Sequence, residues 1–176
     1  MPPHVLVVGG TGILAPAVET LAARGALVSV VSRSSGRAAR LAGTAHPVVA
    51  DVTDAAAFAR ALDRAVEERG PISLALAYQP FAPDEAWHVL AARVEGLLVA
   101  LLVSAYAAKD APAPPLAEGR HGRADVRHLL LGWHRDAGGV RWHTPREVSA
   151  AAVGVADRGE SAVLGVIRPW SERPGS

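Results

Sequence analysis

Cysteine is absent from this chain of 176 residues, lysine occurs only at Lys109, and aromatic residues make up 5% of the sequence. Without cysteine the protein has no disulfide bond and no thiolate metal site. Net charge is also scarce, because 18 basic residues are interleaved with 17 acidic ones and leave a formal charge of +1. This balance gives no basic surface of the kind that binds nucleic acid, so we expect no nucleic-acid partner.

Long hydrophobic runs are missing too, although half of the residues are hydrophobic. Charged residues, Pro or Gly interrupt each apolar stretch well before the roughly 20 residues that a membrane span requires. The N-terminal Met-Pro-Pro-His leads directly into a predicted strand and does not match a signal peptide. We therefore expect a cytoplasmic protein without membrane contact, folded as a single domain over residues 1–176.

The most informative motif of the chain lies in residues 5–15. Val5-Leu-Val-Val8 is a continuous apolar run typical of a central parallel strand, and Gly9-Gly-Thr-Gly-Ile-Leu-Ala15 follows it. Glycines allow a sharp turn and a close approach of ligand to backbone, and the start of the next helix attracts phosphate. The pattern predicts a nucleotide site; the alternative is a strand-turn-helix without a ligand. We assign to the pyrophosphate site Gly9, Thr11, Gly12, Ile13 and Leu14.

Strands and helices alternate along the chain. After the first strand, strands are predicted at 26–31, 47–50, 72–77, 97–104, 126–133 and 162–167, and helices at 18–24, 34–41, 54–69, 83–96 and 144–157. Residues 109–122 are predicted to be a loop, and a turn at 136–139 is predicted to pair 126–133 with 140–142. The order predicts an α/β fold with a doubly wound, mostly parallel, Rossmann-like sheet and a small C-terminal hairpin and helix.

The end of the second predicted strand points to the identity of the nucleotide. A dinucleotide fold that prefers NAD usually carries an acidic residue there, but this chain has Ser32-Arg33-Ser34. The guanidinium of Arg33, with two hydroxyl groups and Arg37, suits the 2′-phosphate of NADP. We therefore expect NADP as the cofactor, with NADPH preferred to NADH. The alternative is a solvent-exposed arginine in an arginine-rich chain.

The glycine motif resembles that of extended and atypical short-chain dehydrogenase/reductases (SDRs). The order of elements and the segments 129–134, 140–149 and 163–170 are also similar to small bacterial proteins of this family. The chain is therefore identified as an atypical, unusually small SDR with a Rossmann NAD(P)-binding fold. The resemblance implies a nicotinamide cofactor and a small-molecule substrate, and it does not name that substrate.

Two further strand ends acquire roles from the resemblance. In SDRs an Asp followed by an apolar residue after the third strand contacts the adenine, which implies this role for Asp51 and Val52; alternatively, Asp51 is a turn residue. The turn after the fourth strand lines the nicotinamide ribose, which assigns Ala77, Tyr78 and Gln79 to the cofactor. The sequence there departs from the usual Asn-Asn-Ala-Gly-like turn, and a turn shaped by Pro80 is the alternative.

The catalytic pattern of the family is matched only in part. SDRs generally use a Ser after the fifth strand, then a Tyr and, four residues later on a helix, a Lys that lowers the Tyr pKa. Ser104 has that place, but Tyr106 and Lys109 are three residues apart, and prolines from residue 112 onward leave barely one helical turn. Ser104, Tyr106 and Lys109 are catalytic candidates; the last two are otherwise a degenerate remnant or a coincidence.

Two functions follow from these observations. The first is an NADPH-dependent oxidoreductase that reduces a small carbonyl, imine or enone, favoured by Ser104 and the aromatic C-terminal part. The second is a catalytically silent NADP-binding sensor or scaffold resembling NmrA-like proteins, favoured by the missing catalytic helix.

The short fourth helix and the aromatic residues permit a homodimer without requiring one. No metal site is expected, because the C-terminal histidines form no HExxH or other ligand spacing.

Overall fold

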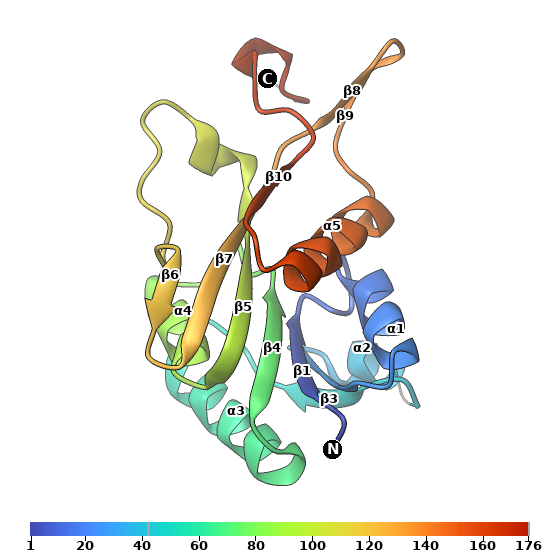
Figure 1. The fold of residues 1–176 in the computed structure, drawn as a ribbon, viewed down its shortest axis with the longest axis vertical. Coiled ribbons are helices and arrows are strands. Elements are labelled where there is room, and N and C mark those ends of the chain that lie inside the picture. Colours follow the sequence, from blue (N-terminus) through green and yellow to red (C-terminus); the bar gives the residue numbers. More distant parts are fainter. Residues whose placement is uncertain (42, 176) are drawn as a thin grey trace.

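An eight-stranded sheet runs through the middle of the molecule (Figure 1). The structure is a computed structural model that describes residues 1–41 and 43–175. The strands of this sheet are β1 (His4–Val8), β2 (Leu27–Ser32), β3 (His46–Val49), β4 (Ile72–Ala77), β5 (Val94–Val103), β6 (Gly119–His121), β7 (Ala124–Leu131) and β10 (Ala162–Leu164). Seven of them pair in parallel in the order β10-β7-β5-β4-β1-β2-β3, and β6 pairs antiparallel with β7. The predicted doubly wound, mostly parallel α/β fold is confirmed.

Helices cover both faces of the sheet (Figure 1). They are α1 (Ala15–Ala23), α2 (Ser35–Ala39), α3 (Ala55–Arg69), α4 (Asp84–Ala91) and α5 (Pro145–Arg158). α1 and α5 pack on one face, and α3 and α4 pack on the other. Within the described part of the chain, the helices are too short or too polar to cross a membrane.

The alternation of side chains along β1 explains why this strand is apolar throughout. Val5 and Val7 belong to the core beneath α1 and α5, whereas Leu6 and Val8 belong to the core beneath α3 and α4. Successive side chains of a strand point to opposite faces, so a central strand covered on both faces is buried at each position. Each face is packed, and the carboxyl ends of β1 to β4 remain as the edge where a ligand can enter.

The predicted helix boundaries are confirmed where they depend on local capping. Asp54 caps α3 by accepting a hydrogen bond from the Ala57 N–H at 3.0 Å. Thr144 and Glu147 form the predicted capping box at the start of α5. The start of α1 was not predicted correctly, because this helix begins at Ala15 rather than at residue 18 and has a proline in its first turn. A side chain or proline that fixes a helix start acts within a few residues, which is why the sequence shows it.

Several predicted boundaries were wrong, and the last predicted strand, 162–167, ends at Leu164. The predicted helix 83–96 ends at Ala91, and β5 begins at Val94, within the predicted helix rather than at residue 97. Gly96 permits this because a Cβ atom there would collide with the backbone oxygen of Ser73 on β4. The predicted loop 109–122 also contains β6.

The predicted pairing of 126–133 with 140–142 was also wrong. β7 pairs with β5 along one edge, and β6 and β10 pair with the two ends of its other edge, so the hairpin partner finds no free edge of sufficient length. Residues 140–142 instead contribute to a separate two-stranded hairpin, β8 (His134–Asp136) with β9 (Gly139–Arg141). This hairpin projects from the carboxyl end of the sheet, on the same side as the C-terminal segment (Figure 1).

His4 predicts an acid sensitivity of the fold. The buried His4 ring donates its Nδ1–H to the Gly70 carbonyl at 2.8 Å, and its Nε2 atom forms a hydrogen bond of 2.8 Å with the Ser29 hydroxyl. Burial lowers the pKa of His4 below its ordinary value of 6.5. Below that pH, His4 binds a proton in the unfolded chain but stays unprotonated in the folded chain. We therefore expect the free energy of unfolding to fall as pH drops below about 6.5.

Urea unfolding measured at about pH 7.5 and about pH 5.5 tests this expectation. The His4→Gln variant provides the control, because its side chain does not titrate and its stability should depend less steeply on pH. An equal pH dependence in the two proteins would contradict the role of His4.

Candidate functional site

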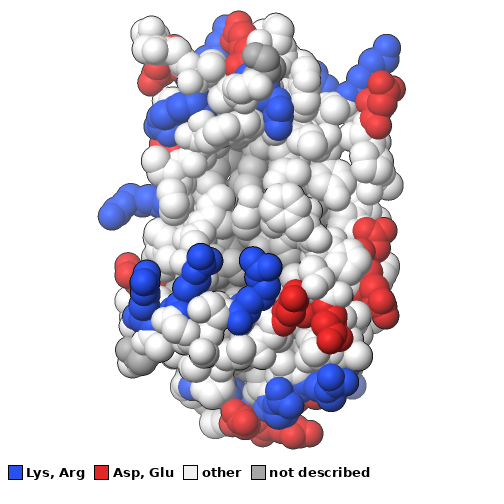
Figure 2. Space-filling model, turned by 180° about the vertical axis from the view of Figure 1, so that it is seen from behind, with Lys and Arg blue, Asp and Glu red and all other residues white. Residues whose placement is uncertain are grey.

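A cleft of about 720 Å³ opens at the carboxyl ends of β1, β2, β3 and β4. Figure 2 shows the molecule from behind, with a hollow of uncharged surface across the middle and a group of basic side chains along its lower margin. Eleven of the residues predicted to bind the cofactor line this cleft: Gly9, Thr11, Gly12, Ile13, Ser32, Arg33, Ser34, Asp51, Val52, Tyr78 and Gln79. The fold thus brings residues from four separate strand ends into one site.

Two residues predicted for the cofactor lie elsewhere. Leu14 and Ala77 are fully buried in the hydrophobic cores on opposite faces of the sheet. Both are next to residues of the cleft in sequence, and they support the site by packing. Conversely, Phe81 lines the cleft with 93% of its surface exposed, although no sequence motif points to it. An exposed phenyl ring on a cleft wall is an apolar surface available to a flat ligand group.

The three glycines after β1 have different structural roles. Gly9 has a φ of +90°, which favours glycine, and its carbonyl accepts hydrogen bonds from the N–H groups of Gly12 and Leu14, each at 3.2 Å. A Cβ atom at Gly10 would lie 2.9 Å from the Val30 Cγ1 atom, so Gly10 allows close packing. A Cβ atom at Gly12 would meet only the Gly9 oxygen, at 3.9 Å. Gly12 therefore presents its backbone to open space in the cleft.

The start of α1 faces this turn with its partial positive charge uncompensated. The first turn of α1 contains no acidic residue, and the N-cap residue, Leu14, supplies no side-chain hydrogen bond. The N–H groups of Gly12, Leu14 and Ala15 donate to carbonyl groups within the turn, whereas those of Thr11 and Ile13 have no partner among the described residues. Free N–H groups beside a helix start, together with the helix dipole, form a ready site for an anion. The glycine turn and the helix start together suit a pyrophosphate.

Basic and hydroxyl groups gather after β2. Ser34 caps α2, accepting a hydrogen bond from the Arg37 N–H at 3.3 Å, and the Ser32 hydroxyl bonds the backbone of Ser34. These bonds fix the turn that presents Arg33. The side chains of Arg33 and Arg37 both line the cleft, and neither forms an ion pair among the described residues. Two guanidinium groups are available to an anion here.

Asp51 is a turn residue that also lines the cleft. Its Oδ1 atom accepts hydrogen bonds from the Thr53 N–H at 2.9 Å and the Thr53 hydroxyl at 2.7 Å, so it shapes the turn after β3. Those bonds, and to a smaller extent the charge of Arg33, lower the pKa of Asp51. The residue also lines the cleft. Its position as a turn residue is what places the carboxylate at the cleft wall.

The turn after β4 places an unsatisfied amide beside the cleft. Gln79 is 4% exposed, and neither its Oε1 nor its Nε2 atom has a hydrogen-bond partner among the described residues. Tyr78 is half-buried next to it, and burial raises the pKa of its phenol. A buried amide without partners is costly. A ligand that offers both a donor and an acceptor would satisfy Gln79.

The three predicted catalytic residues do not line this cleft. Ser104 begins a short 3-10 helix (Ser104–Ala107) directly after β5, is 3% exposed, and accepts a hydrogen bond from the Arg173 Nε–H at 3.0 Å. Tyr106 lines a different cavity of about 470 Å³, together with His128. Lys109 is exposed in the following loop. The structure thus separates Tyr106 and Lys109 from the residues predicted to hold the cofactor.

Aromatic and basic side chains of the C-terminal segment gather beyond β5 and β7. The Trp133 ring is fully buried and packs edge-to-face on Trp170 with 6.1 Å between ring centroids. The Arg173 guanidinium lies 5.1 Å from the Trp142 ring centroid and 5.3 Å from that of Trp170. Contact with these two rings holds the Arg173 guanidinium against Ser104, at the end of β5. Residues far apart in the sequence thus meet at this strand end.

Comparison with known proteins gives the fold. No family model and no curated protein matches the sequence. A short-chain dehydrogenase/reductase from Serratia marcescens is similar in structure, with 18% identity over 93% of this chain and 96% of that chain and a TM-score of 0.69. A dehydrogenase/reductase from Sinorhizobium meliloti has 16% identity over 93% of both chains and a TM-score of 0.70. A short-chain type dehydrogenase/reductase from Mycobacterium marinum has 17% identity over 93% of both chains and a TM-score of 0.65.

Proposed function

We propose that this chain, which has the Rossmann fold of short-chain dehydrogenase/reductases, binds NADP(H) in the cleft and reduces a small carbonyl, imine or enone. The observation that carries the proposal is the meeting of three features in one cleft: the glycine turn at the start of α1, Arg33 after β2, and the unsatisfied Gln79 after β4. Each suits a different part of a dinucleotide. Their spacing along one sheet edge supports a single extended ligand rather than separate small ones.

The chain's own groups would hold the cofactor from end to end. The N–H groups of Thr11 and Ile13, which have no partner among the described residues, would bind the pyrophosphate at the start of α1, where no carboxylate competes. Asp51 and Val52 would line the adenine, and the amide of Gln79 would bond the polar groups nearer the nicotinamide. When bound, the reduced cofactor supplies the hydride for the reaction.

Of the three catalytic candidates, Ser104 is the one at a strand end on the cleft side of the sheet, although its side chain is buried and does not line the cleft. It follows β5, which pairs in parallel with β4, so it lies at the same edge of the sheet as Gln79. Its Oγ atom already accepts the Arg173 hydrogen bond, which leaves its own O–H free to donate to a substrate oxygen. A hydroxyl polarised by a guanidinium is a stronger donor to developing negative charge.

Arg33 should determine the preference for NADPH. The Arg33→Gln substitution is expected to weaken NADPH binding about tenfold or more, because a charge-assisted hydrogen bond contributes roughly 1.5–3 kcal/mol. NADH lacks the 2′-phosphate, so its dissociation constant should change little. Calorimetric titration with both nucleotides measures the two constants.

The matched control for this prediction is Arg60→Gln, which removes an exposed arginine on α3 that does not line the cleft. It should leave both constants unchanged. Equal affinities for NADPH and NADH in the unmodified protein would exclude the assigned role of Arg33.

A catalytically silent NADP-binding protein is the second candidate function. It is favoured by the positions of Tyr106, in a separate cavity, and of Lys109, exposed in a loop. Neither position gives the chain a proton donor inside the cleft. Such a protein would sense the NADPH to NADP ratio by binding alone.

One experiment separates the two candidates. NADPH binding is measured by calorimetry, and NADPH oxidation is followed by absorbance in the presence of panels of small aldehydes, ketones, imines and enones. Binding together with oxidation supports the oxidoreductase, and binding without oxidation across the panels supports the sensor. Absence of NADPH binding would contradict both.

A further inference from the structure

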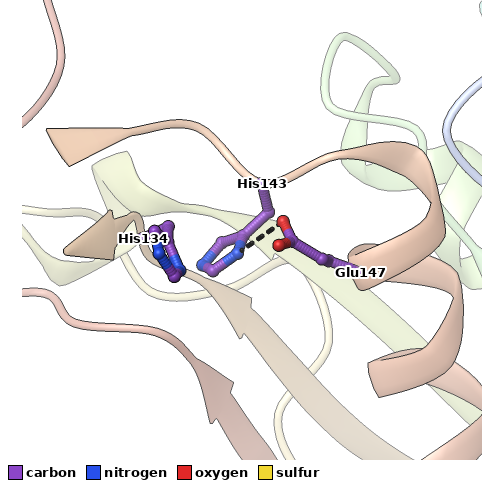
Figure 3. A group of neighbouring side chains, drawn as sticks. All are labelled: His134, His143 and Glu147. Atoms are coloured by element: carbon purple, nitrogen blue, oxygen red, sulfur yellow. Dashed lines mark hydrogen bonds and ion pairs between the residues drawn. The ribbon is translucent and has the colours of Figure 1, made fainter. Parts of the chain in front are cut away.

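Three potential metal ligands converge beyond the carboxyl end of β7, outside the nucleotide cleft. His134 lies on β8, His143 precedes α5, and Glu147 lies in the first turn of α5. One ligand atom from each side chain lies within 4.8 Å of the other two. Figure 3 shows the His143 ring between the side chains of His134 and Glu147. No local spacing motif shows this group in the sequence, because His134 comes from the hairpin.

Carboxylates orient both histidine rings. The Nε2 atom of His134 lies 2.9 Å from the Asp136 Oδ2 atom, and Asp136 is itself held by the Gly138 N–H at 2.8 Å. The Nδ1 atom of His143 lies 3.3 Å from the Glu147 Oε2 atom. A carboxylate on one ring nitrogen fixes the ring and raises the basicity of the other nitrogen, as it does for histidines that bind metals.

The hydrogen bonds of His143 are incomplete in the protein alone. Its side chain is 6% exposed, and its Nε2 atom has no partner among the described residues. With Nδ1–H donated to Glu147, Nε2 carries a buried lone pair on the side of the ring toward His134 (Figure 3). An unsatisfied buried acceptor costs free energy, which a cation would recover. The side chain of His134 is one-third exposed, so an ion can reach the cluster from solvent on that side.

We propose that His134, His143 and Glu147 form a binding site for a divalent transition-metal ion of the zinc type. The histidines coordinate through imidazole nitrogens, and Glu147 supplies negative charge either as a third ligand or through its bond to His143. Ligands bind zinc at about 2.0–2.2 Å, so the partly exposed side chains of His134 and Glu147 must move inward. The ion would fasten the β8–β9 hairpin to the start of α5.

The Arg141 guanidinium competes with the proposed metal ion for the Glu147 carboxylate. Its guanidinium donates to both carboxylate oxygens of Glu147, at 3.0 and 2.8 Å. The Thr144 N–H also donates to Oε2, at 2.8 Å, so both carboxylate oxygens are already engaged. The Arg141 charge opposes a second cation at the same place. Removing this charge should therefore strengthen metal binding.

The test uses the untagged full chain, freed of metal with a chelator and titrated calorimetrically with Zn²⁺. We expect one ion per chain and a rise of the unfolding temperature with added Zn²⁺. His134→Ala should weaken binding at least about tenfold and remove that rise. The control His88→Ala, an exposed histidine on α4, should change neither. Circular dichroism checks that each variant folds.

The Arg141→Gln variant separates a metal site from a cluster that only stabilises the fold, because only a metal site would gain affinity for Zn²⁺. It should tighten Zn²⁺ binding severalfold, because Glu147 keeps its charge and loses its competitor. The proposal is overturned if the protein binds no Zn²⁺, if His134→Ala binds as tightly as the unmodified chain, or if Arg141→Gln leaves the affinity unchanged. None of these measurements depends on NADP binding or on activity.

Discussion

Replacing Gly12 with valine is expected to weaken NADPH binding about 100-fold or more, because two charge-assisted hydrogen bonds of roughly 1.5–3 kcal/mol each would be lost. The Gly12 position faces open space, and a Cβ atom there would have only the Gly9 oxygen within 4 Å, so the added methyl groups would enter the path of the pyrophosphate. The Cβ atom itself would meet no side chain within 4 Å. The free energy of unfolding should therefore change little, and calorimetry together with urea unfolding measures both quantities.

Gly10→Val is the matched substitution with the opposite pattern. A Cβ atom at Gly10 would lie 2.9 Å from Val30 and 3.0 Å from Val18, so this variant should lose about 1–3 kcal/mol of stability through overpacking. Gly12→Val should thus weaken NADPH binding while the free energy of unfolding stays nearly unchanged. Gly10→Val should instead lower the free energy of unfolding. Normal NADPH affinity in a folded Gly12→Val protein would contradict the proposed pyrophosphate site.

Replacing Trp133 with alanine is expected to lower the free energy of unfolding by about 3–5 kcal/mol. The indole is fully buried, contacts Trp170 edge-to-face, and lies where the Trp133 backbone exchanges two hydrogen bonds of 3.0 Å with Val166. Its removal leaves a cavity between the sheet and the C-terminal segment. Urea unfolding followed by circular dichroism measures the loss without relying on tryptophan fluorescence.

Trp142→Ala controls for the loss of a tryptophan as such. Trp142 is 45% exposed, and its ring contacts the Arg173 guanidinium, so its removal should cost no more than about 1 kcal/mol. Equal stability losses in the two variants would show that Trp133 does not anchor the C-terminal segment. A loss confined to Trp133→Ala would place the anchor at that residue.

Much of the fold was predictable because its signals are local or periodic. The apolar run of β1 follows from burial on both faces, and the starts of α3 and α5 follow from the capping residues Asp54 and Thr144. The boundary between α4 and β5 was missed because Gly96 is set by its approach to Ser73 on the neighbouring strand. No residue near Gly96 in sequence carries that information.

The candidate nucleotide site also has some features that the sequence shows and others that only the structure shows. The turn at Gly9 and the absence of an acid after β2 are visible in the sequence, since each feature occupies one strand end. The exposure of Phe81, the unsatisfied amide of Gln79 and the separation of Tyr106 from the cleft emerge only when the strand ends are assembled.

The sequence by itself determined the alternating strands and helices, the glycine turn and the basic strand end, because backbone preference and side-chain periodicity act over a few residues. The tertiary structure alone decided which distant side chains meet. It placed Arg173 on Ser104 and brought His134 to His143, contacts that span 69 residues in the first case and join the hairpin to the start of α5 in the second. Such contacts depend on how the layers pack, and packing is a property of the whole chain.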